Sequence, residues 1–582
     1  MHADRLCDFI MKGGITSGVV YPSAITEVAQ RFWFSGIAGT SAGAIAAALH
    51  AAAELRRRNG SPEGYGLLEG VPGTVGGGDK LLDLFRPDRS TRGAFKLFRS
   101  AVAMGDQSAA LPIERILGGY IWRKVTFRSP EKQVVDNGLG LCTGMALGNR
   151  GGAKLPPLTE WLSEQIDEIA GMGHGHRPLT FGDLHDAPAP SNDAVRAVMG
   201  ERTGVYLQMI TTSLSFARPY AMPYLDERFA FRPSELRQFF PGYVVDYLEE
   251  RGRVLKEDMA TPPPGDLLPM PVGGDMPVIV AVRMSLSFPV LFTPIPLHYP
   301  DSMGTGAYRK IWFSDGGITS NLPVYFFDSP FPRWPTLAMN MQYATWDKEK
   351  QQNVYGRDGV GDNQRIWMAE DNADGMGEQW SEMTMNGKPL GQLLSFFGAI
   401  FRSAQTWSDS TLIKLPGYRD RVAEVWLVKG EGGLNLDMPD ETVQHLIGVG
   451  RRAGEQLVER FADAPANEEM SWEGHRWCRY RTSMAAMARY LRRWEMGVST
   501  TLAGDRSLDD LLAAVDVPTS YRFRDALQLT EATRVHGELR ALVQQASGVR
   551  GDAPAGDQSV PFDGGPKSDL AIQPRLSLTP VR

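Results

Sequence analysis

The 582-residue sequence has little of several features, and each shortage excludes a class of protein. Its three cysteines, Cys7, Cys142 and Cys478, are too few and too far apart for a disulfide framework, which favours reduced thiols. A net charge of −7 gives no field that attracts nucleic acid, so we expect no nucleic-acid partner. No apolar run reaches the ~18 residues that span a membrane. Any membrane contact is therefore expected to be peripheral.

The start of the chain also lacks the features of a secretory signal. No basic region is followed there by a long apolar core and a cleavage site. We therefore expect a cytoplasmic protein, with association at a membrane surface as the alternative. The hydrophobic content of 42% is ordinary for a globular protein and suffices for a large core.

The most informative motif that is present is Gly39-Thr40-Ser41-Ala42-Gly43. It follows an apolar stretch, 33–38, and precedes an alanine-rich stretch, 42–58. This pattern predicts a strand, a sharp turn and a helix, which together form a nucleophile elbow. Gly39 and Gly43 permit the strained turn that lifts the Ser41 hydroxyl clear of the sheet. Because a chain with 63 glycines can contain such a motif by chance, its context decides its meaning.

One part of that context is Asp315-Gly316-Gly317, which follows the apolar stretch 310–314. The motif places a carboxylate at the end of a predicted strand, with Gly316 and Gly317 behind it. An aspartate in that position can serve as the base for Ser41.

The other part is a glycine-rich turn, Gly13-Gly14-Ile15, which follows the apolar stretch 6–11 and opens a helical stretch. Such a turn presents unpaired backbone N–H groups. The amides of Gly13, Gly14 and Ile15 are therefore candidates for an oxyanion hole. The chain thus carries an oxyanion turn, a nucleophile and a base in that order.

In this order, the three motifs resemble those of the bacterial patatin-like phospholipase family, in which a serine and an aspartate form a dyad without histidine. Other segments between residues 5 and 345 resemble the same family: 178–184, 205–215, 283–289 and 321–323. One departure is that Thr16 and Ser17 stand where the family usually has a basic residue, and Lys12 is the cation nearby.

The resemblance implies a serine hydrolase that acts on acyl esters of lipids, of the phospholipase A or lysophospholipase type. Its substrate partner would be a phospholipid or another lipid, and it would need no metal and no cofactor. A lipid acyltransferase that uses the same acyl-enzyme is an open alternative. So is a regulated lipase whose C-terminal helices sense a ligand, a protein partner or a membrane. The sequence does not indicate an oligomeric state.

The expected fold class is α/β, with a mostly parallel central sheet flanked by helices, a helical insertion and a helical C-terminal extension. Apolar stretches at 205–211, 278–282 and 336–341 are further expected strands. Helices are expected at 390–408, 440–462, 473–497 and 520–547. The expected domains are a catalytic domain (1–431), with an insertion or lid at about 60–200 and a mobile loop at about 347–379, a helical extension (432–549) and a disordered tail (550–582).

Four other patterns compete with this interpretation and are weaker. A phosphate loop would need Lys80 directly after the glycines, but Asp79 intervenes. The stretch 370–381 begins like a calcium loop and lacks its final glutamate. His174 and His176 can chelate zinc only if two more ligands converge. A Ser-His-Asp triad would need one of the later histidines, for which the candidates are His445, His475 and His536.

The stretch 477–494 predicts an amphipathic, basic helix. Its apolar residues recur at alternating steps of three and four, and six arginines lie mostly on the other faces. Packing of the apolar stripe against the catalytic domain is one interpretation, and contact with anionic lipid headgroups is the other.

Overall fold

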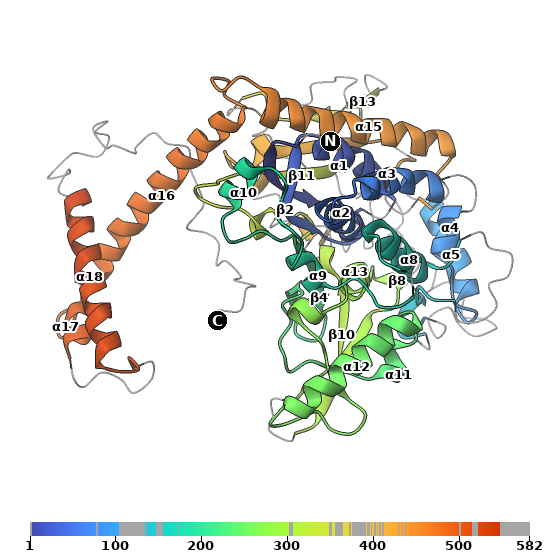
Figure 1. Cartoon of the computed structure of the whole chain (residues 1–582), viewed down its shortest axis with the longest axis horizontal. Helices are drawn as coiled ribbons and strands as arrows, with labels where there is room; N and C mark the ends of the chain where they lie inside the picture. Colours follow the sequence, from blue (N-terminus) through green and yellow to red (C-terminus); the bar gives the residue numbers. More distant parts are fainter. Residues whose placement is uncertain are drawn as a thin grey trace.

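The computed structural model is a mixed α/β protein with a large central sheet (Figure 1). The residues that the structure describes are 3–14, 16–76, 80–103, 134–135, 137–146, 155–173, 175–301, 306–347, 352–354, 365–371, 374, 392, 396, 399–400, 403, 405–406, 409, 412–428, 430–432, 435–436, 438–499, 502–514 and 522–547.

The strands are β1 (Arg5–Met11), β2 (Phe32–Gly39), β3 (Gly140–Cys142), β4 (Tyr206–Ser213), β5 (Arg218–Met222), β6 (Ala230–Phe231), β7 (Leu268–Pro269), β8 (Val290–Phe292), β9 (Ile295–Pro300), β10 (Tyr308–Asp315), β11 (Thr336–Tyr343), β12 (Thr345–Asp347), β13 (Gln352–Val354), β14 (Ile366–Trp367) and β15 (Val422–Leu427). The helices are α1 (Tyr21–Ala29), α2 (Ala42–Arg58), α3 (Glu63–Val75), α4 (Lys80–Leu84), α5 (Arg92–Ala103), α8 (Leu158–Ala170), α9 (Phe181–His185), α10 (Asp193–Met199), α11 (Pro233–Leu236), α12 (Gly242–Asp258), α13 (Val278–Ser285), α15 (Asp440–Val458), α16 (Trp472–Ser499), α17 (Leu508–Ala513) and α18 (Ala526–Ser547).

The central sheet is mixed, which corrects the expectation of a mostly parallel one. Its order is β14-β15-β11-β1-β2-β4-β10-β9-β6-β7, and β5 pairs with β4. The ladders from β15 through β11, β1 and β2 to β4 are parallel. Beyond β4 the pairs of β10, β9, β6 and β7 are antiparallel, as are β5 with β4 and β14 with β15. The apolar runs 205–211 and 336–341 do lie in the parallel ladders, where strands are covered on both faces.

Most of the elements expected from local patterns are confirmed. The strands expected before the three glycine motifs are β1, β2 and β10, and the helix expected after Ser41 is α2. α15, α16 and α18 lie where helices are expected at 440–462, 473–497 and 520–547. Most of the helix expected at 390–408 lies outside the described residues.

The expectation of a strand at 278–282 is wrong, because this stretch is part of helix α13. All residues of α13 are buried, and an apolar run of this kind fits a buried helix as well as a buried strand. The tertiary structure decides for the helix, because α13 packs against α2, α8 and β4 instead of joining the sheet.

Helices and short segments cover opposite faces of the parallel ladders. The main apolar core lies where α1, α2, α13 and α15 pack on the sheet. A smaller cluster on the other face brings Ile10, Ala38 and Ala338 together with Leu322 and Ile413 from the connecting segments. Both faces of β1 and β2 are therefore dry, and their carboxyl ends are rigid supports for a site.

The expected domain boundary at 431/432 falls between β15, a strand of the central sheet, and α15, which packs on β15 and α1. α15 lies along α1 (Figure 1), and its glycines meet α1 and the turn before it directly. A Cβ atom at Gly450 would lie 2.0 Å from Val20 O, and one at Gly454 2.7 Å from Ala24 O. Only glycine permits this close approach. α15 is thus part of the core that packs against α1 and the turn before it.

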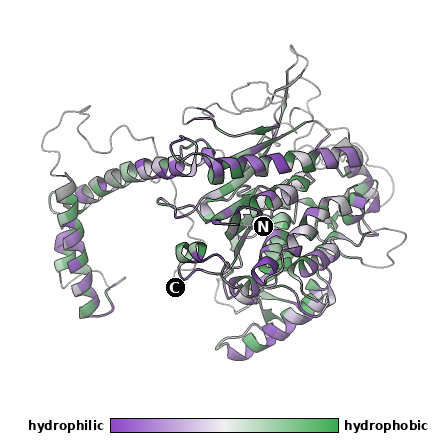
Figure 2. Ribbon diagram, turned by 45° about the horizontal axis from the view of Figure 1, so that its top comes forward, coloured by the Kyte–Doolittle hydropathy of each residue, from purple (hydrophilic) through white to green (hydrophobic). Residues whose placement is uncertain are grey.

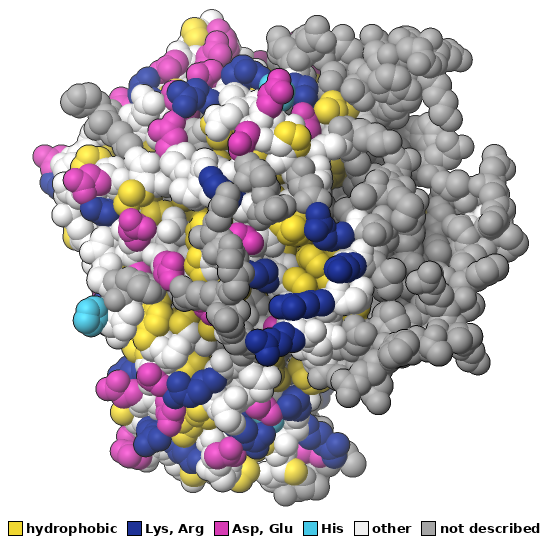
Figure 3. All heavy atoms as spheres, turned by 90° about the vertical axis from the view of Figure 1, so that its right-hand side faces the viewer, with side chains coloured by type: hydrophobic (Ala, Val, Ile, Leu, Met, Phe, Trp, Pro, Cys, Tyr) yellow, Lys and Arg dark blue, Asp and Glu magenta, His cyan; other side chains and the backbone are white. Residues whose placement is uncertain are grey.

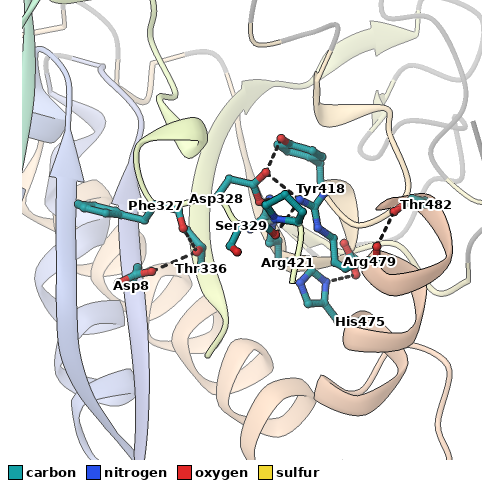
Figure 4. Close-up of polar contacts among 12 residues, drawn as sticks. Asp8, Phe327, Asp328, Ser329, Thr336, Tyr418, Arg421, His475, Arg479 and Thr482 are labelled. Carbon is teal, nitrogen blue, oxygen red and sulfur yellow. Dashed lines mark hydrogen bonds and ion pairs between the residues drawn. The ribbon is translucent and has the colours of Figure 1, made fainter. Parts of the chain in front are cut away.

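The C-terminal helices leave the body as an arm formed by the far end of α16 with α17 and α18 (Figure 1). Near its start, α16 docks through buried charges (Figure 4). Arg479 Nη2 lies 2.8 Å from Asp328 Oδ2, and Arg421 Nη2 lies 2.5 Å from Asp328 Oδ1. Burial alone would raise the pKa of Asp328, but the charges of Arg421 and Arg479 outweigh it and hold that pKa below its usual range.

The arm carries many exposed apolar side chains, and Figure 2 shows them interspersed with hydrophilic ones along α18. On α18, Leu527, Val535, Leu539 and Leu542 are exposed. The face seen in Figure 3 mixes acidic and basic side chains, with a group of Lys and Arg near its middle. Within the described part of the chain, no helix is both long enough and apolar enough to cross a bilayer.

Candidate active site

The first element of the site is the turn between β2 and α2, which has the strained backbone of a nucleophile elbow. Ser41 has φ 55° and ψ −128°, a conformation that non-glycine residues rarely adopt. A Cβ atom at Gly39 would lie 2.0 Å from Gly43 O, and one at Gly43 would lie 2.3 Å from Met11 O. The two flanking glycines therefore permit both the turn and its contact with the end of β1.

The second element is Asp315, the last residue of β10. This strand pairs with β4 in the register Asp315 with Thr211, while β4 also pairs with β2. The sheet thus brings the ends of β2 and β10 to the same region. Gly316 continues the turn against β4, where a Cβ atom would lie 2.0 Å from Ile210 O. The Gly317 amide donates to Asp315 Oδ1 at 2.7 Å.

The Ser41 and Asp315 side chains are both buried, and they lie close enough for the Ser41 hydroxyl to lower the pKa of the Asp315 carboxyl group. Ser41 is 5% exposed and Asp315 is 2% exposed. Burial raises the pKa of Asp315 to about 7, although hydrogen bonding by the Ser41 side chain and the Gly317 amide opposes the rise. Asp315 Oδ2 is buried and has no partner of regular hydrogen-bond geometry among the described residues. The carboxyl group is therefore close to the hydroxyl and incompletely hydrogen-bonded.

The third element is the glycine-rich turn between β1 and α1. Gly13 N donates to Asn321 O at 3.3 Å, whereas Gly14 N meets no acceptor within the described part of the chain. Ile15, the remaining candidate, lies outside the described residues. Ala42 opens α2, so its N–H has no acceptor one turn earlier in that helix. Gly14 and Ala42 thus carry amides without a protein acceptor among the described residues, and Ala42 lies at the positive end of α2, next to Ser41.

The segment 283–289 hydrogen-bonds to the backbone of both Ser41 and Asp315. Ser285 Oγ accepts a hydrogen bond from Ser41 N at 3.1 Å, and Ser287 O accepts one from Asp315 N at 3.0 Å. Arg283 is 1% exposed and donates to Ser287 Oγ at 2.7 Å. Burial lowers the pKa of Arg283 to about 9. The sequence marked this segment only by its family resemblance and did not indicate these contacts.

Two further side chains adjoin the site that sequence reasoning did not assign to it. A Cβ atom at Gly13 would lie 2.4 Å from Asn321 Oδ1 and 2.9 Å from Ser41 Cβ. Asp409 Oδ2 accepts hydrogen bonds from Asn321 N at 2.8 Å and Leu322 N at 2.9 Å. Burial raises the pKa of Asp409, while those amides and the nearby Lys12 charge oppose the rise. No motif marks Asp409, because it lies 88 residues beyond Asn321 in the chain.

The histidines that a triad would need are engaged elsewhere. His475 Nδ1 lies 2.6 Å from Asp420 Oδ2 beside α16, and His536 Nε2 lies 2.7 Å from Asp509 Oδ1 on the arm. His445 lies near Arg365. Among the described residues, none of the three contacts Ser41 or Asp315. His174 lies outside the described residues, as does most of the calcium-like stretch.

The fold and this site define an α/β protein with a serine elbow, a buried aspartate and unpaired amides. No family model matches the chain. A protein of Rhizobium meliloti (strain 1021) named "RpoH suppressor" is 30% identical over 670 aligned residues, which cover 98% of this chain and 99% of that protein. The chain belongs to the family of the RpoH suppressor, a name that states no reaction.

Among solved structures, the chain shows a distant similarity to two structures of the type III effector protein ExoU. Its crystal structure has 11% identity and a TM-score of 0.25, covering 92% of this chain and 70% of that chain. The heterodimeric ExoU-SpcU complex of Pseudomonas aeruginosa has 15% identity and a TM-score of 0.22, covering 95% and 73%. Scores this low do not establish a common fold.

Proposed function

We propose that this protein is a serine acyl-ester hydrolase of the patatin-like type, with Ser41 as nucleophile and Asp315 as base. The observation that carries the proposal is the proximity of the Ser41 hydroxyl, on a strained turn, to a buried carboxyl group whose pKa burial raises to about 7. A carboxylate with that pKa is a stronger base than an ordinary aspartate, and it changes protonation near neutral pH.

In the proposed reaction, Ser41 Oγ attacks the ester carbonyl while its proton passes to Asp315. The negative charge that forms on the carbonyl oxygen is stabilised by the Gly14 and Ala42 amides and by the start of α2. Collapse of the tetrahedral intermediate releases the alcohol, which takes the proton from Asp315. Water then attacks the acyl-enzyme and gives a proton to Asp315. As the bond from the acyl carbon to Ser41 Oγ breaks, Asp315 returns that proton to Ser41 Oγ and the acid is released.

The motif resemblance supports a lipid acyl ester as the substrate class. The exposed apolar arm and the mixed charges of the surface are compatible with work at a lipid interface, but they do not select a headgroup. We therefore propose lipid acyl hydrolysis without naming the lipid. The acyltransferase alternative differs only in the acceptor, so adding a soluble alcohol and analysing products for a new ester separates the two.

The test uses a fluorophosphonate probe and a short-chain nitrophenyl ester with the full chain. Wild type should be labelled at Ser41 and should hydrolyse the ester. Ser41→Ala should lose labelling and at least about 10³-fold of turnover, because the acyl-enzyme cannot form. Ser234→Ala, an exposed serine on α11, is the control and should match wild type. Equal turnover in Ser41→Ala and wild type would end the proposal.

A second candidate is a regulated enzyme, and the arm is the observation that favours it. The exposed apolar side chains on α18 would be removed from water if a protein partner or a membrane bound there. In this form of the proposal, basal ester hydrolysis is low and rises on addition of the partner or of anionic vesicles. Replacing Val535, Leu539 and Leu542 by serine should remove the rise and leave basal hydrolysis unchanged.

A further inference from the structure

The Asn321 carboxamide lies between the turns that carry the three candidate groups. Its Oδ1 would be 2.4 Å from a Cβ atom at Gly13 and 3.0 Å from one at Gly317. The first position is also 2.9 Å from Ser41 Cβ, and the second is 2.8 Å from Asp315 Oδ1. Two glycines thus leave room for this one side chain beside both the nucleophile and the acid.

The carboxamide is also left without partners. Asn321 Oδ1 is buried and has no hydrogen bond, and no acceptor among the described residues takes one from Nδ2. The buried Oδ1 can only accept a hydrogen bond, so it is not the atom that meets an oxyanion. The Nδ2 group of the same carboxamide is a donor, and the carbonyl oxygen of an ester offers it an acceptor as that oxygen becomes negative.

The backbone of Asn321 is held firmly on both sides. Its amide and that of Leu322 donate to the Asp409 carboxylate, and its carbonyl accepts from Gly13 N. Ser320 Oγ adds a longer contact of 3.4 Å to Asp409 Oδ1. A side chain on a fixed backbone loses little freedom when it binds, which is the condition for effective stabilisation of a transition state.

We propose that Asn321 is a further catalytic residue whose Nδ2 group donates a hydrogen bond to the oxyanion, alongside Gly14 and Ala42, and that Asp409 is its positioning residue. This inference rests on the proposed function. The N–H group gains most of its interaction when the oxygen carries charge, because charge-assisted hydrogen bonds are stronger than neutral ones. Its contribution therefore belongs to the transition state more than to substrate binding.

The experiment measures ester hydrolysis and the rate of Ser41 phosphonylation in the full chain. Asn321→Ala should lower kcat and the phosphonylation rate by about 10²-fold. KM should change by less than about threefold, because the lost interaction forms in the transition state. Asn59→Ala, at the exposed far end of α2, is the matched control and should equal wild type in both. If Asn321→Ala does not fold, Asn321→Asp, which has the same size and no N–H donor when ionised, should give the same loss.

Three results overturn the inference. One is a kcat of Asn321→Ala within about twofold of wild type, and another is a raised KM with an unchanged kcat. In both cases Ser41→Ala remains inactive, so the proposed function survives. The third is a wild-type protein that neither hydrolyses the ester nor reacts with the probe, which overturns the proposed function and this inference together.

A double-mutant cycle tests the role of Asp409. Asp409→Asn keeps the shape and removes the charge, and it should lower kcat by about tenfold with wild-type Asn321. In the Asn321→Ala background the same change should cost less than about twofold, because Asp409 acts through Asn321. Fully additive losses would refute the positioning role, and a general loss of stability would appear in both backgrounds alike.

Discussion

At the scale of single residues, the protein keeps one carboxyl group in an environment that disfavours its charge. Asp315 is almost fully buried, and burial raises its pKa to about 7. The positive charge of Lys12 acts on Asp409, where it opposes the effect of burial on the pKa. The same burial that makes Asp315 a useful base therefore makes it costly for the folded state.

The first prediction concerns the pH dependence of activity. Asp315 accepts a proton only when ionised, so kcat/KM for ester hydrolysis should rise with pH and level off above about 7. Below that pH it should fall by about tenfold per pH unit. A profile measured from pH 5 to 9 checks this. An apparent pKa near the ordinary value for aspartate, about 4, would contradict the assignment.

The second prediction concerns stability. Because the pKa of Asp315 is raised in the folded protein, its contribution is most favourable below about pH 4 and is lost as pH rises toward 7. Asp315→Asn removes that cost. It should be more stable than wild type by up to about 4 kcal/mol above pH 7, and by much less at pH 4. Denaturant unfolding of both proteins at the two pH values measures the difference, and an equal gain at both would contradict it.

At the scale of elements, the site depends on close backbone contacts between β1, β2 and the start of α2. Gly43 lies against Met11 O and Lys12 O, so the elbow and the oxyanion turn touch without side chains between them. Gly66 on α3 has open space around it. The close contact requires a glycine at position 43, whereas position 66 has room for a side chain, so Gly66 serves as the matched control.

The third prediction compares these glycines. Gly43→Ala places a Cβ atom 2.3 Å from Met11 O, which forces the two turns apart. It should destabilise the protein by about 2 kcal/mol or more and lower kcat by at least about tenfold. Gly66→Ala should stabilise the protein by about 0.5–1 kcal/mol and leave kcat unchanged. Thermal unfolding and ester hydrolysis measure both effects, and similar behaviour of the two variants would count against the close contact.

At the scale of the whole molecule, the arm is tied to the body by buried ionic contacts at the start of α16. Asp328, between β10 and β11, receives hydrogen bonds from Tyr418, Arg421 and Arg479 (Figure 4). This attachment lies on the side of β11 where the strand begins, and Ser41 lies where β2 ends.

The fourth prediction concerns this attachment. Arg479→Met removes one cation from the Asp328 cluster and should destabilise the protein by about 1.5–3 kcal/mol. It should also increase protease cleavage within α16, because the helix is less firmly docked. Arg493→Met, on an exposed part of the same helix, is the control. If both variants unfold and are cleaved like wild type, the cluster does not hold the arm.

Local sequence patterns predicted much of the elbow and its surroundings. Gly39, Ser41 and Gly43 mark a turn whose shape follows from neighbouring residues alone, and the runs around it have clear strand or helix character. The sequence also predicted that each glycine motif follows the end of a strand, because each motif comes directly after an apolar stretch. These strands are β1, β2 and β10. Local chemistry determines these features, so the sequence was sufficient for them.

The tertiary structure alone decided the rest. A uniformly apolar run such as 278–282 fits either a strand or a helix, and only packing against α2 and β4 selects the helix. Strand direction beyond β4 depends on which partners pair, so the mixed sheet has no local signature. Ser285 bonds to Ser41 N, Asn321 lies beside the Gly13 turn, and Asp409 holds the Asn321 backbone, all from distant parts of the chain. Their contacts, and the burial that raises the pKa of Asp315, arise only when the whole chain packs.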